Sequence, residues 1–419
     1  MNNSRVLRAA LSTLFLLPAI AGATNGYFVH GVGTASRSLA GVGIALPLDG
    51  LAAGNNPAGV SFVDDRADVG LSWFRPERGA EIVGNLAGAN GQYDGSGKKD
   101  FFVPELGLIK HFAPALTGSL AIYGNGGMNT QYAQNPFGAF GSKGQAGVDL
   151  SQLFIAPTIA YKVTDTQSIG ASVVFAYQRF KAEGLSAFDN PYFTASPGHV
   201  TDQGYDSSTG WGVRLGWTGR IAPTLTLGAT WASKIRTGEF DKYRGLFAES
   251  GGFDIPSNYG LGLAWAANDA LTLAADWQRI AYSEIKSVGN PLAKLNAGNP
   301  LGSADGPGFG WKDISVYKLG ASYTLNPAVT LRAGYSHADQ PIPADQTLLN
   351  IVAPGVVQDH LSLGATWRVS PAGDLSLGFT HGLKQTVNGS RSIPPAFGGG
   401  EANIHLQENI FDIAYGWRF

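Results

Sequence analysis

The sequence predicts an all-β fold, a 14-stranded antiparallel transmembrane β-barrel with an N-terminal hatch inside its lumen. After residue 65, apolar residues alternate with polar or small ones, which is the pattern of strands with one apolar face. Tight turns alternate with long loops, as in membrane barrels with short turns at one end and long outer loops at the other. Charged residues make up only 14% of the chain, against about 25% in soluble proteins.

The N-terminus has the features of a signal peptide. Arg5 and Arg8 precede an apolar run over residues 9–20, and Ala21-Gly22-Ala23 places small residues where a signal peptidase cleaves. The run is shorter than the roughly 18 apolar residues of a spanning helix. We therefore expect residues 1–23 to be removed and the mature protein to lie in the bacterial outer membrane.

Residues 24–65 follow neither a strand pattern nor a long helix pattern. Their glycines fall in pairs, at Gly31 and Gly33 and again at Gly41 and Gly43, and the apolar side chains between them are mostly small. Such a segment buries too little surface to fold alone. We expect residues 24–65 to form a hatch that is surrounded by a barrel of residues 66–419.

The barrel strands follow in order. In the clearest one, Trp211, Val213, Leu215 and Trp217 share one parity while glycines, threonine and arginine share the other. An even number of strands, most of them nine to eleven residues or more, suits a closed barrel that crosses a bilayer. Strands are predicted at residues 66–76, 102–112, 116–124, 152–163, 168–180, 208–221, 225–235, 257–266, 271–283, 312–325, 329–337, 359–369, 374–385 and 407–419.

Aromatic residues support a membrane location. Many lie on the apolar parity near strand ends, where interfacial girdles form. The final strand alternates up to the terminal residue Phe419, which resembles the C-terminal signal of outer-membrane barrels, so we expect the barrel-assembly machinery to be a partner. The girdle residues are Trp73, Trp231, Trp265, Trp277, Trp367, Trp417, Tyr161, Tyr177, Tyr335 and Tyr415.

The hatch carries a family resemblance. Asn25-Gly26-Tyr27-Phe28, the Gly/Ala spacing from Gly31 to Ala45, Asp49 and Asn56-Pro57-Ala58 resemble the hatch of the FadL-type family, outer-membrane transporters of long-chain fatty acids and related hydrophobic compounds. The resemblance implies capture of ligand by outer loops, a pocket in the lumen, and a sideways exit into the membrane beside a kinked third strand. We place the kink at Gly124, Gly126 and Gly127; the alternative is that these glycines only begin the outer loop.

An amphipathic ligand needs one polar anchor among apolar walls. Arg214 and Lys318 lie near mid-strand on the lumen parity, and Arg214 is favoured because a guanidinium can hold a carboxylate with two hydrogen bonds. The alternative for each lumen charge is an ion pair to the hatch or to a neighbouring strand. Within the hatch, Arg37 and Asp49 either anchor it or open it when ligand arrives. The lumen-parity charges are Glu105, Arg214, Asp276, Lys318, Arg332, Arg368, Asp412 and Arg418.

The long outer loops are unusually apolar for exposed segments, which suits either a capture surface or packing of the loops against each other. Their apolar residues are Phe137, Phe140, Phe188, Tyr192, Phe193, Leu246, Phe247 and Phe253. Among the expected ligand contacts we count Phe188, Phe193 and Phe247, together with Phe28 of the hatch.

Catalysis is not expected. The chain has no Cys, and its seven His form no metal-ligand spacing, so no cofactor and no metal are predicted. The net charge of −2 gives no reason to expect nucleic acid. The prediction is a monomer for passive uptake of long-chain fatty acids or other hydrophobic molecules. Aromatic-hydrocarbon import in the same family, a general porin, and an adhesin or phage receptor that works through its loops remain alternatives.

Overall fold

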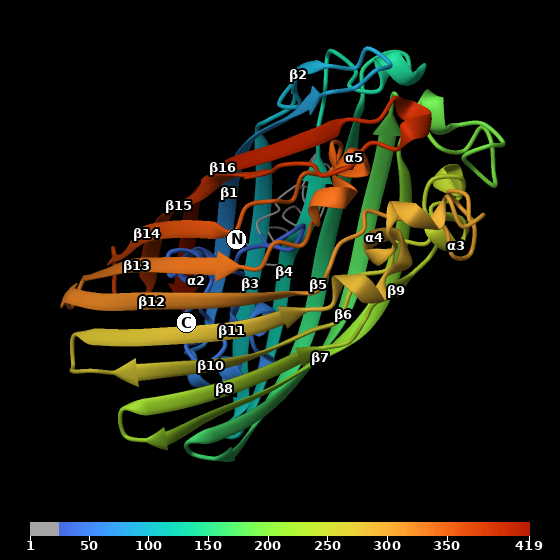
Figure 1. Cartoon of the computed structure of the whole chain (residues 1–419). Helices are drawn as coiled ribbons and strands as arrows, with labels where there is room; N and C mark the ends of the chain where they lie inside the picture. The colour runs from blue at the N-terminus through green and yellow to red at the C-terminus, as the bar shows by residue number, and fades with distance from the viewer. Residues whose placement is uncertain (1–24) are drawn as a thin grey trace, which may run out of the picture.

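The computed structural model describes residues 25–419, so the signal peptide predicted over residues 1–23 lies outside the described part of the chain. Fourteen long antiparallel strands form one closed sheet, because the last strand, β16, pairs with β1 as well as with β15. Tight turns gather at one end of the barrel, and the long loops with their short helices gather at the other (Figure 1). The predicted barrel is therefore confirmed.

Each of the fourteen predicted strands is present. The barrel strands are β1 (Arg66–Val83), β3 (Phe101–Ala113), β4 (Leu116–Asn129), β5 (Gly147–Thr164), β6 (Gln167–Glu183), β7 (Asp206–Ala222), β8 (Leu225–Ala232), β10 (Asn258–Ala266), β11 (Leu271–Ile280), β12 (Ile314–Asn326), β13 (Val329–Ala338), β14 (Asp359–Arg368), β15 (Gly373–Val387) and β16 (Glu401–Arg418). Two short strands were not predicted. β2 (Gly91–Asp94) pairs with β1, and β9 (Arg236–Thr237) pairs with β7.

The largest differences from prediction are at the outer strand ends. β1 continues to Val83 and β16 begins at Glu401, so the two strands pair over the whole length of both, from Arg66 with Arg418 to Val83 with Glu401. In this outer part Glu77 and Glu81 replace the apolar residues of the outward parity, so the period-two signal disappears although the backbone remains extended.

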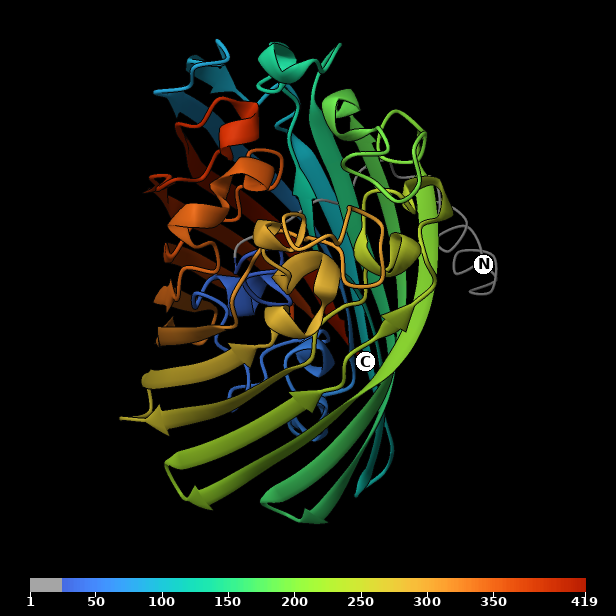
Figure 2. The same ribbon diagram turned by 45° about the vertical axis from the view of Figure 1, so that its right-hand side comes forward.

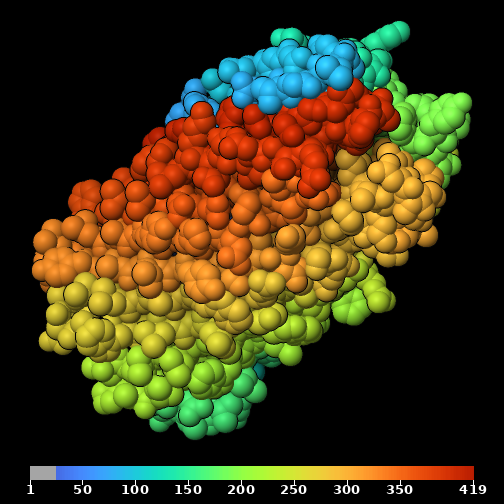
Figure 3. Space-filling view, viewed as in Figure 1, coloured from blue at the N-terminus to red at the C-terminus, as the bar shows by residue number. Residues whose placement is uncertain are grey.

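The outward parity is apolar where the strands would meet lipid. Phe175 of β6 lies beside Ile155 of β5 and Trp211 of β7, and Phe175 and Trp211 are exposed. On the face that Figure 3 presents, the wall of yellow to red strands is continuous. None of the helices among residues 25–419 is long and apolar enough to cross a membrane.

The helices among residues 25–419 are all short. Three belong to the hatch: α2 (Thr34–Arg37), η1 (Ala52–Gly54) and η2 (Pro57–Phe62). The others lie in the outer loops: η3 (Gly138–Phe140), η4 (Ser186–Phe188), η5 (Asp241–Tyr243), α3 (Ala248–Gly251), η6 (Tyr282–Glu284), α4 (Lys286–Gly289), η7 (Leu292–Lys294), η8 (Ala344–Gln346), α5 (Thr347–Asn350) and η9 (Pro395–Phe397).

The hatch segment that precedes β1 lies inside the barrel, where Figure 2 shows it in blue between the strands. Glycines on the lumen face make room for it. A side chain at Gly216 of β7 would overlap the Asn56 side chain, and one at Gly334 of β13 would overlap the backbone of Leu39. Lumen-facing glycine therefore reflects close approach of the hatch backbone rather than weak strand propensity.

Candidate functional site

Arg37, on hatch helix α2, ties the hatch to two strands of the wall. Its guanidinium donates two hydrogen bonds to Glu105 of β3, at 2.9 and 3.0 Å, and one to Asp412 of β16, at 2.9 Å. Burial opposes the charge of Arg37, but Asp412 and Glu105 hold its pKa above the ordinary value. This geometry fits the anchoring role, one of the two roles that the sequence left open.

The Asn56-Pro57-Ala58 motif docks the other side of the hatch. The Asn56 amide nitrogen donates to the backbone oxygens of Ile44 and Trp217 at 2.8 and 3.0 Å, and its side-chain oxygen accepts from Ala58 N at 3.1 Å. Asparagine thus caps η2, and proline follows at the first helical position. Pro57 and Ala58 lie directly against Gly170 of β6.

The two cations that we favoured for binding a carboxylate contact the hatch in this state. Arg214 donates to Gly54 O, and Lys318 Nζ donates to His30 O and Gly41 O at 3.1 and 3.2 Å. Both side chains are buried. Contact with a ligand carboxylate would need the hatch to move away, and that role stays a prediction.

Other lumen charges also serve the hatch or its neighbouring strands. The Asp276 carboxylate accepts from Gly43 N and Ile44 N at 2.8 and 3.0 Å. Asp49 accepts from Leu51 N, and burial together with nearby Asp68 raises its pKa to about 7. Near the tight-turn end, Asp374 pairs with Arg418 and Arg368, while Arg332 donates to Thr366 Oγ1 at 2.6 Å.

A buried imidazole pair adds a further contact between hatch and wall. The rings of His30 and His360 lie 4.5 Å apart, and His360 Nε2 is 3.0 Å from Glu408 Oε1. Burial, followed by the nearby His360 and Lys318, lowers the pKa of His30 well below its usual value. Over residues 25–419, no group of three His, Asp or Glu side chains is placed to hold a metal ion.

The outer loops enclose an apolar pocket, here called the loop pocket. Its cavity has a volume of about 40 Å³. Its lining residues are Phe137, Val148, Phe180, Leu185, Phe188, Val200, Leu246, Phe247, Ser287, Leu301, Pro307, Gly308, Phe309, Leu349 and Val352. The fold therefore brings four of the eight apolar loop residues named from the sequence into one wall, and it buries most of them.

The remaining apolar loop residues are placed differently. Phe140 and Phe193 both pack on Phe397, whereas Phe253 lies between the rings of Phe247 and Tyr27. Tyr192 is 89% exposed and joins none of these contacts.

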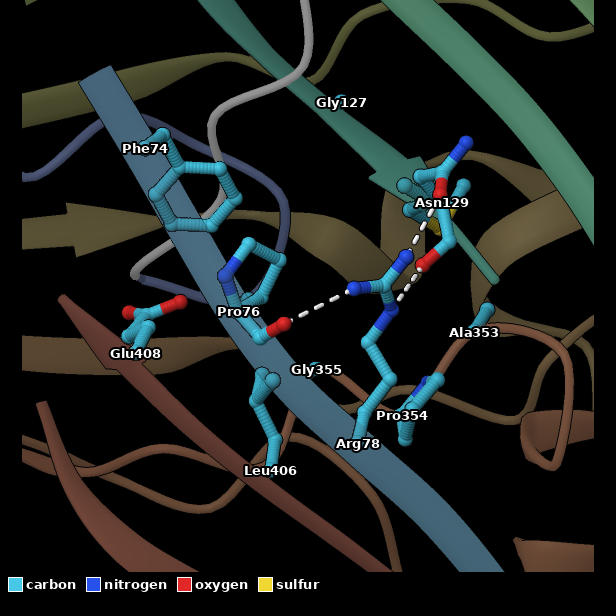
Figure 4. A pocket seen from close by; sticks show the side chains of 12 residues that line it. Phe74, Pro76, Arg78, Gly127, Asn129, Ala353, Pro354, Gly355, Leu406 and Glu408 are labelled. Carbon is cyan, nitrogen blue, oxygen red and sulfur yellow. Dashed lines mark hydrogen bonds between the residues drawn. The ribbon is translucent and has the colours of Figure 1, made fainter. Parts of the chain in front are cut away.

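A second cavity, here called the gate pocket, lies deeper in the lumen and has a volume of about 30 Å³ (Figure 4). Its lining residues are Gly26, Phe74, Pro76, Arg78, Gly127, Met128, Asn129, Ala353, Pro354, Gly355, Leu406 and Glu408. Sequence reasoning missed Arg78 because it ended β1 at residue 76, whereas Glu408 lies within the predicted last strand but was not counted among the lumen charges. Continuing the even, lumen-facing parity beyond residue 76 would have found Arg78.

Hatch aromatics join the two pockets. Tyr27 is fully buried, and its ring lies 6.0 Å from Phe253, 5.1 Å from Tyr282 and 5.9 Å from Trp311. Phe28, the predicted hatch contact, packs beside Tyr27 and Tyr282. One continuous apolar cluster therefore extends from the loop pocket to the hatch residues next to Gly26 in the gate pocket.

The pairing between neighbouring strands of the barrel wall is interrupted beside the gate pocket. β3 pairs with β4 only up to Leu106 and Ile122, although β3 continues to Phe101 and β4 continues to Asn129. The predicted kink glycines all lie within β4, and its pairing with β5 shifts register between Gly124 and Gly126.

The N-terminal end of the hatch occupies the bend of β4. Val29 N donates to Asn125 O at 2.8 Å, and Gly127 N donates to Tyr27 O at 3.0 Å. A Cβ atom at Gly126 would overlap Tyr27 O. The bend thus needs glycine and places the gate pocket beside the point where β3 and β4 part.

Comparisons with known proteins give one family model and several solved structures with the same fold. The family model described as "Outer membrane protein transport protein (OMPP1/FadL/TodX)" matches residues 18–394. No curated protein matches the chain. Among solved structures, a Pseudomonas aeruginosa FadL homologue is similar with a TM-score of 0.71 at 17% identity, over 94% of this chain and all of the other.

Two further structures have the same fold. The Pseudomonas putida toluene transporter TodX is similar with a TM-score of 0.69 at 18% identity, over 94% of this chain and all of the other. The Ralstonia pickettii toluene transporter TbuX is similar with a TM-score of 0.65 at 19% identity, over 93% of this chain and 99% of the other.

Proposed function

Because the chain belongs to the OMPP1/FadL/TodX family of outer membrane transport proteins, we propose that it takes up hydrophobic molecules from outside the cell and releases them sideways into the outer membrane. The observation that carries the proposal is the parting of β3 and β4 beside the gate pocket, above a lumen that the hatch fills.

Such a route is favourable for an apolar ligand. Each methylene group removed from water contributes about 0.8 kcal/mol, so transfer of an apolar ligand from water through the loop pocket into the membrane is favourable. The loop pocket suits the first step because its lining is almost entirely apolar.

Two substrate classes fit this route. Long-chain fatty acids are the first, with Arg214 or Lys318 as the proposed carboxylate contact after the hatch has shifted. Aromatic hydrocarbons are the second, and the similarity to the toluene transporters TodX and TbuX favours them. Arg214→Ala should weaken uptake of oleate more than uptake of toluene if the carboxylate is recognised. Equal effects would favour the hydrocarbon class.

The capture step has a direct test. Leu246→Asp places an unpaired carboxylate in the loop pocket and should weaken oleate binding to the purified protein by about 2 kcal/mol or more. Leu86→Asp is the matched control, because Leu86 is 92% exposed in another outer loop. Unchanged binding by the Leu246 variant would refute capture in the loop pocket.

The remaining parts of the proposal concern assembly and chemistry. We infer that the protein acts as a monomer without catalysis, since the barrel closes within one chain. The outward-facing aromatics of β16 and the terminal Phe419 are the proposed contact with the barrel-assembly machinery. Deletion of Phe419 should lower the amount of folded protein in the outer membrane without changing uptake per folded molecule.

A further inference from the structure

Beyond Ile122, β4 pairs with β5 on one side, whereas on the other side the hatch backbone bonds it only at Asn125 and Gly127. β4 pairs with β5 up to Asn129, which lies opposite Asp149. On its other side it has no β3 partner beyond Ile122, because β3 turns to pair with β1 alone up to Phe101. An extended segment released from its ladder needs another group to fix its position.

Arg78 is the side chain that reaches the outer end of β4 from across the gap, next to the backbone hydrogen bonds of Gln131 with Gly95 and Gly97. Its Nε donates to Asn129 O at 2.6 Å, and one Nη donates to Asn129 Oδ1 and to Lys98 O, each at 2.5 Å. The other Nη donates to Pro76 O at 3.0 Å. Figure 4 shows the guanidinium reaching from β1 to the end of β4.

The partners of Arg78 are unusual for a buried cation. The residue is 3% exposed, and within residues 25–419 all the hydrogen-bond acceptors of its side chain are neutral oxygens. A buried charge is costly unless it is paired or fully hydrogen-bonded. The planar guanidinium offers five donors in a fixed fork, and here this fork joins β1, the end of β4 and the segment that leads into β3.

We propose that Arg78 is a positioning residue that holds the outer rim of the gap between β3 and β4, where the two strands have parted. It keeps Asn129 and the bend of β4 at a fixed distance from β1, so that the gate pocket stays open towards the membrane. The inference rests on the proposed function, because it assigns a role in sideways release and none in capture.

The substitution Arg78→Met tests the proposal, because it keeps much of the side-chain volume and removes the donors. The maximal rate of oleate uptake by cells should fall by roughly tenfold or more, since one hydrogen bond from a charged group corresponds to about that factor. Oleate binding to the purified protein in the loop pocket should stay unchanged. Arg78→Lys should recover part of the rate, since an ammonium reaches fewer of the three segments.

Arg75→Met is the matched control. Arg75 lies on the opposite face of β1 and is half-exposed, with one guanidinium nitrogen 3.6 Å from a carboxylate oxygen of Asp100. Its replacement should leave oleate uptake unchanged. The proposal would be overturned if Arg78→Met took up oleate at the maximal rate of the native protein. It would also be overturned if oleate binding to the purified variant fell by the same factor as the uptake rate. Failure of the proposed function would be seen instead in the native protein, as oleate uptake no faster than that of cells lacking it.

Discussion

Replacing Arg37 with methionine should unseat the hatch. The change leaves Glu105 and Asp412, both 5% exposed, beneath the hatch without their counter-ion. Removing one partner of a buried ion pair costs about 3–5 kcal/mol. Because about 1.4 kcal/mol is a factor of ten, the ratio of seated to unseated hatch should fall by roughly a hundredfold to several thousandfold.

Conductance across planar lipid bilayers measures this ratio, since an unseated hatch leaves a water-filled lumen. The native protein should stay closed and Arg37→Met should show frequent large openings. The triple variant with Glu105→Gln and Asp412→Asn should close again, because no buried charge then lacks a partner. If Arg37→Met is as closed as the native protein, the ion pairs do not hold the hatch.

Three further outcomes are expected. Asn56→Ala removes the hydrogen bonds to Ile44 and Trp217 and leaves their carbonyl oxygens unsatisfied, which should destabilise the seated hatch by about 1–3 kcal/mol and raise the frequency of openings in the same bilayer assay. Gly126→Val places a side chain against Tyr27 O and should slow oleate uptake by cells while leaving oleate binding in the loop pocket intact; normal uptake would exclude a role for the close approach. Burial raises the pKa of Asp49 to about 7, so the stabilisation of the seated hatch by the protonated form is lost as pH rises through 7. Openings should therefore increase from pH 5 to pH 8, and Asp49→Asn should flatten that dependence.

The barrel was predictable because its signals are local. The alternation around Trp211 and the tight turn at Pro327 each reflect backbone geometry within a few residues, and such signals place strands and turns without knowledge of their neighbours. The same signals fail where the outward face of a strand becomes polar, as at Glu77 and Glu81, which is why the outer extension of β1 and its Arg78 were missed.

The functional contacts were harder to predict because they join distant segments. The alternation of residues along the strands correctly predicted that Arg214 and Lys318 face the lumen. Nothing in the sequence shows that, in the closed barrel, their side chains bind the hatch carbonyls of Gly54 and His30. The apolar loop residues likewise look like an exposed capture surface. Their burial around the loop pocket depends on how several loops fold over one another, which no local pattern contains.

The central claim is that the ligand leaves sideways and does not pass through the space that the hatch occupies. The chain contains no cysteine, so an engineered disulfide can lock the hatch to the wall unambiguously. A Cβ atom at position 320 would lie 3.0 Å from Leu39 Cβ, close to the roughly 3.5–4.5 Å of disulfide-bonded residues. Uptake of toluene, which carries no carboxylate and needs no contact with Arg214 or Lys318, should be the same for the oxidised and reduced forms of the Leu39→Cys/Gly320→Cys variant. Uptake that stops on oxidation and returns on reduction would contradict sideways release.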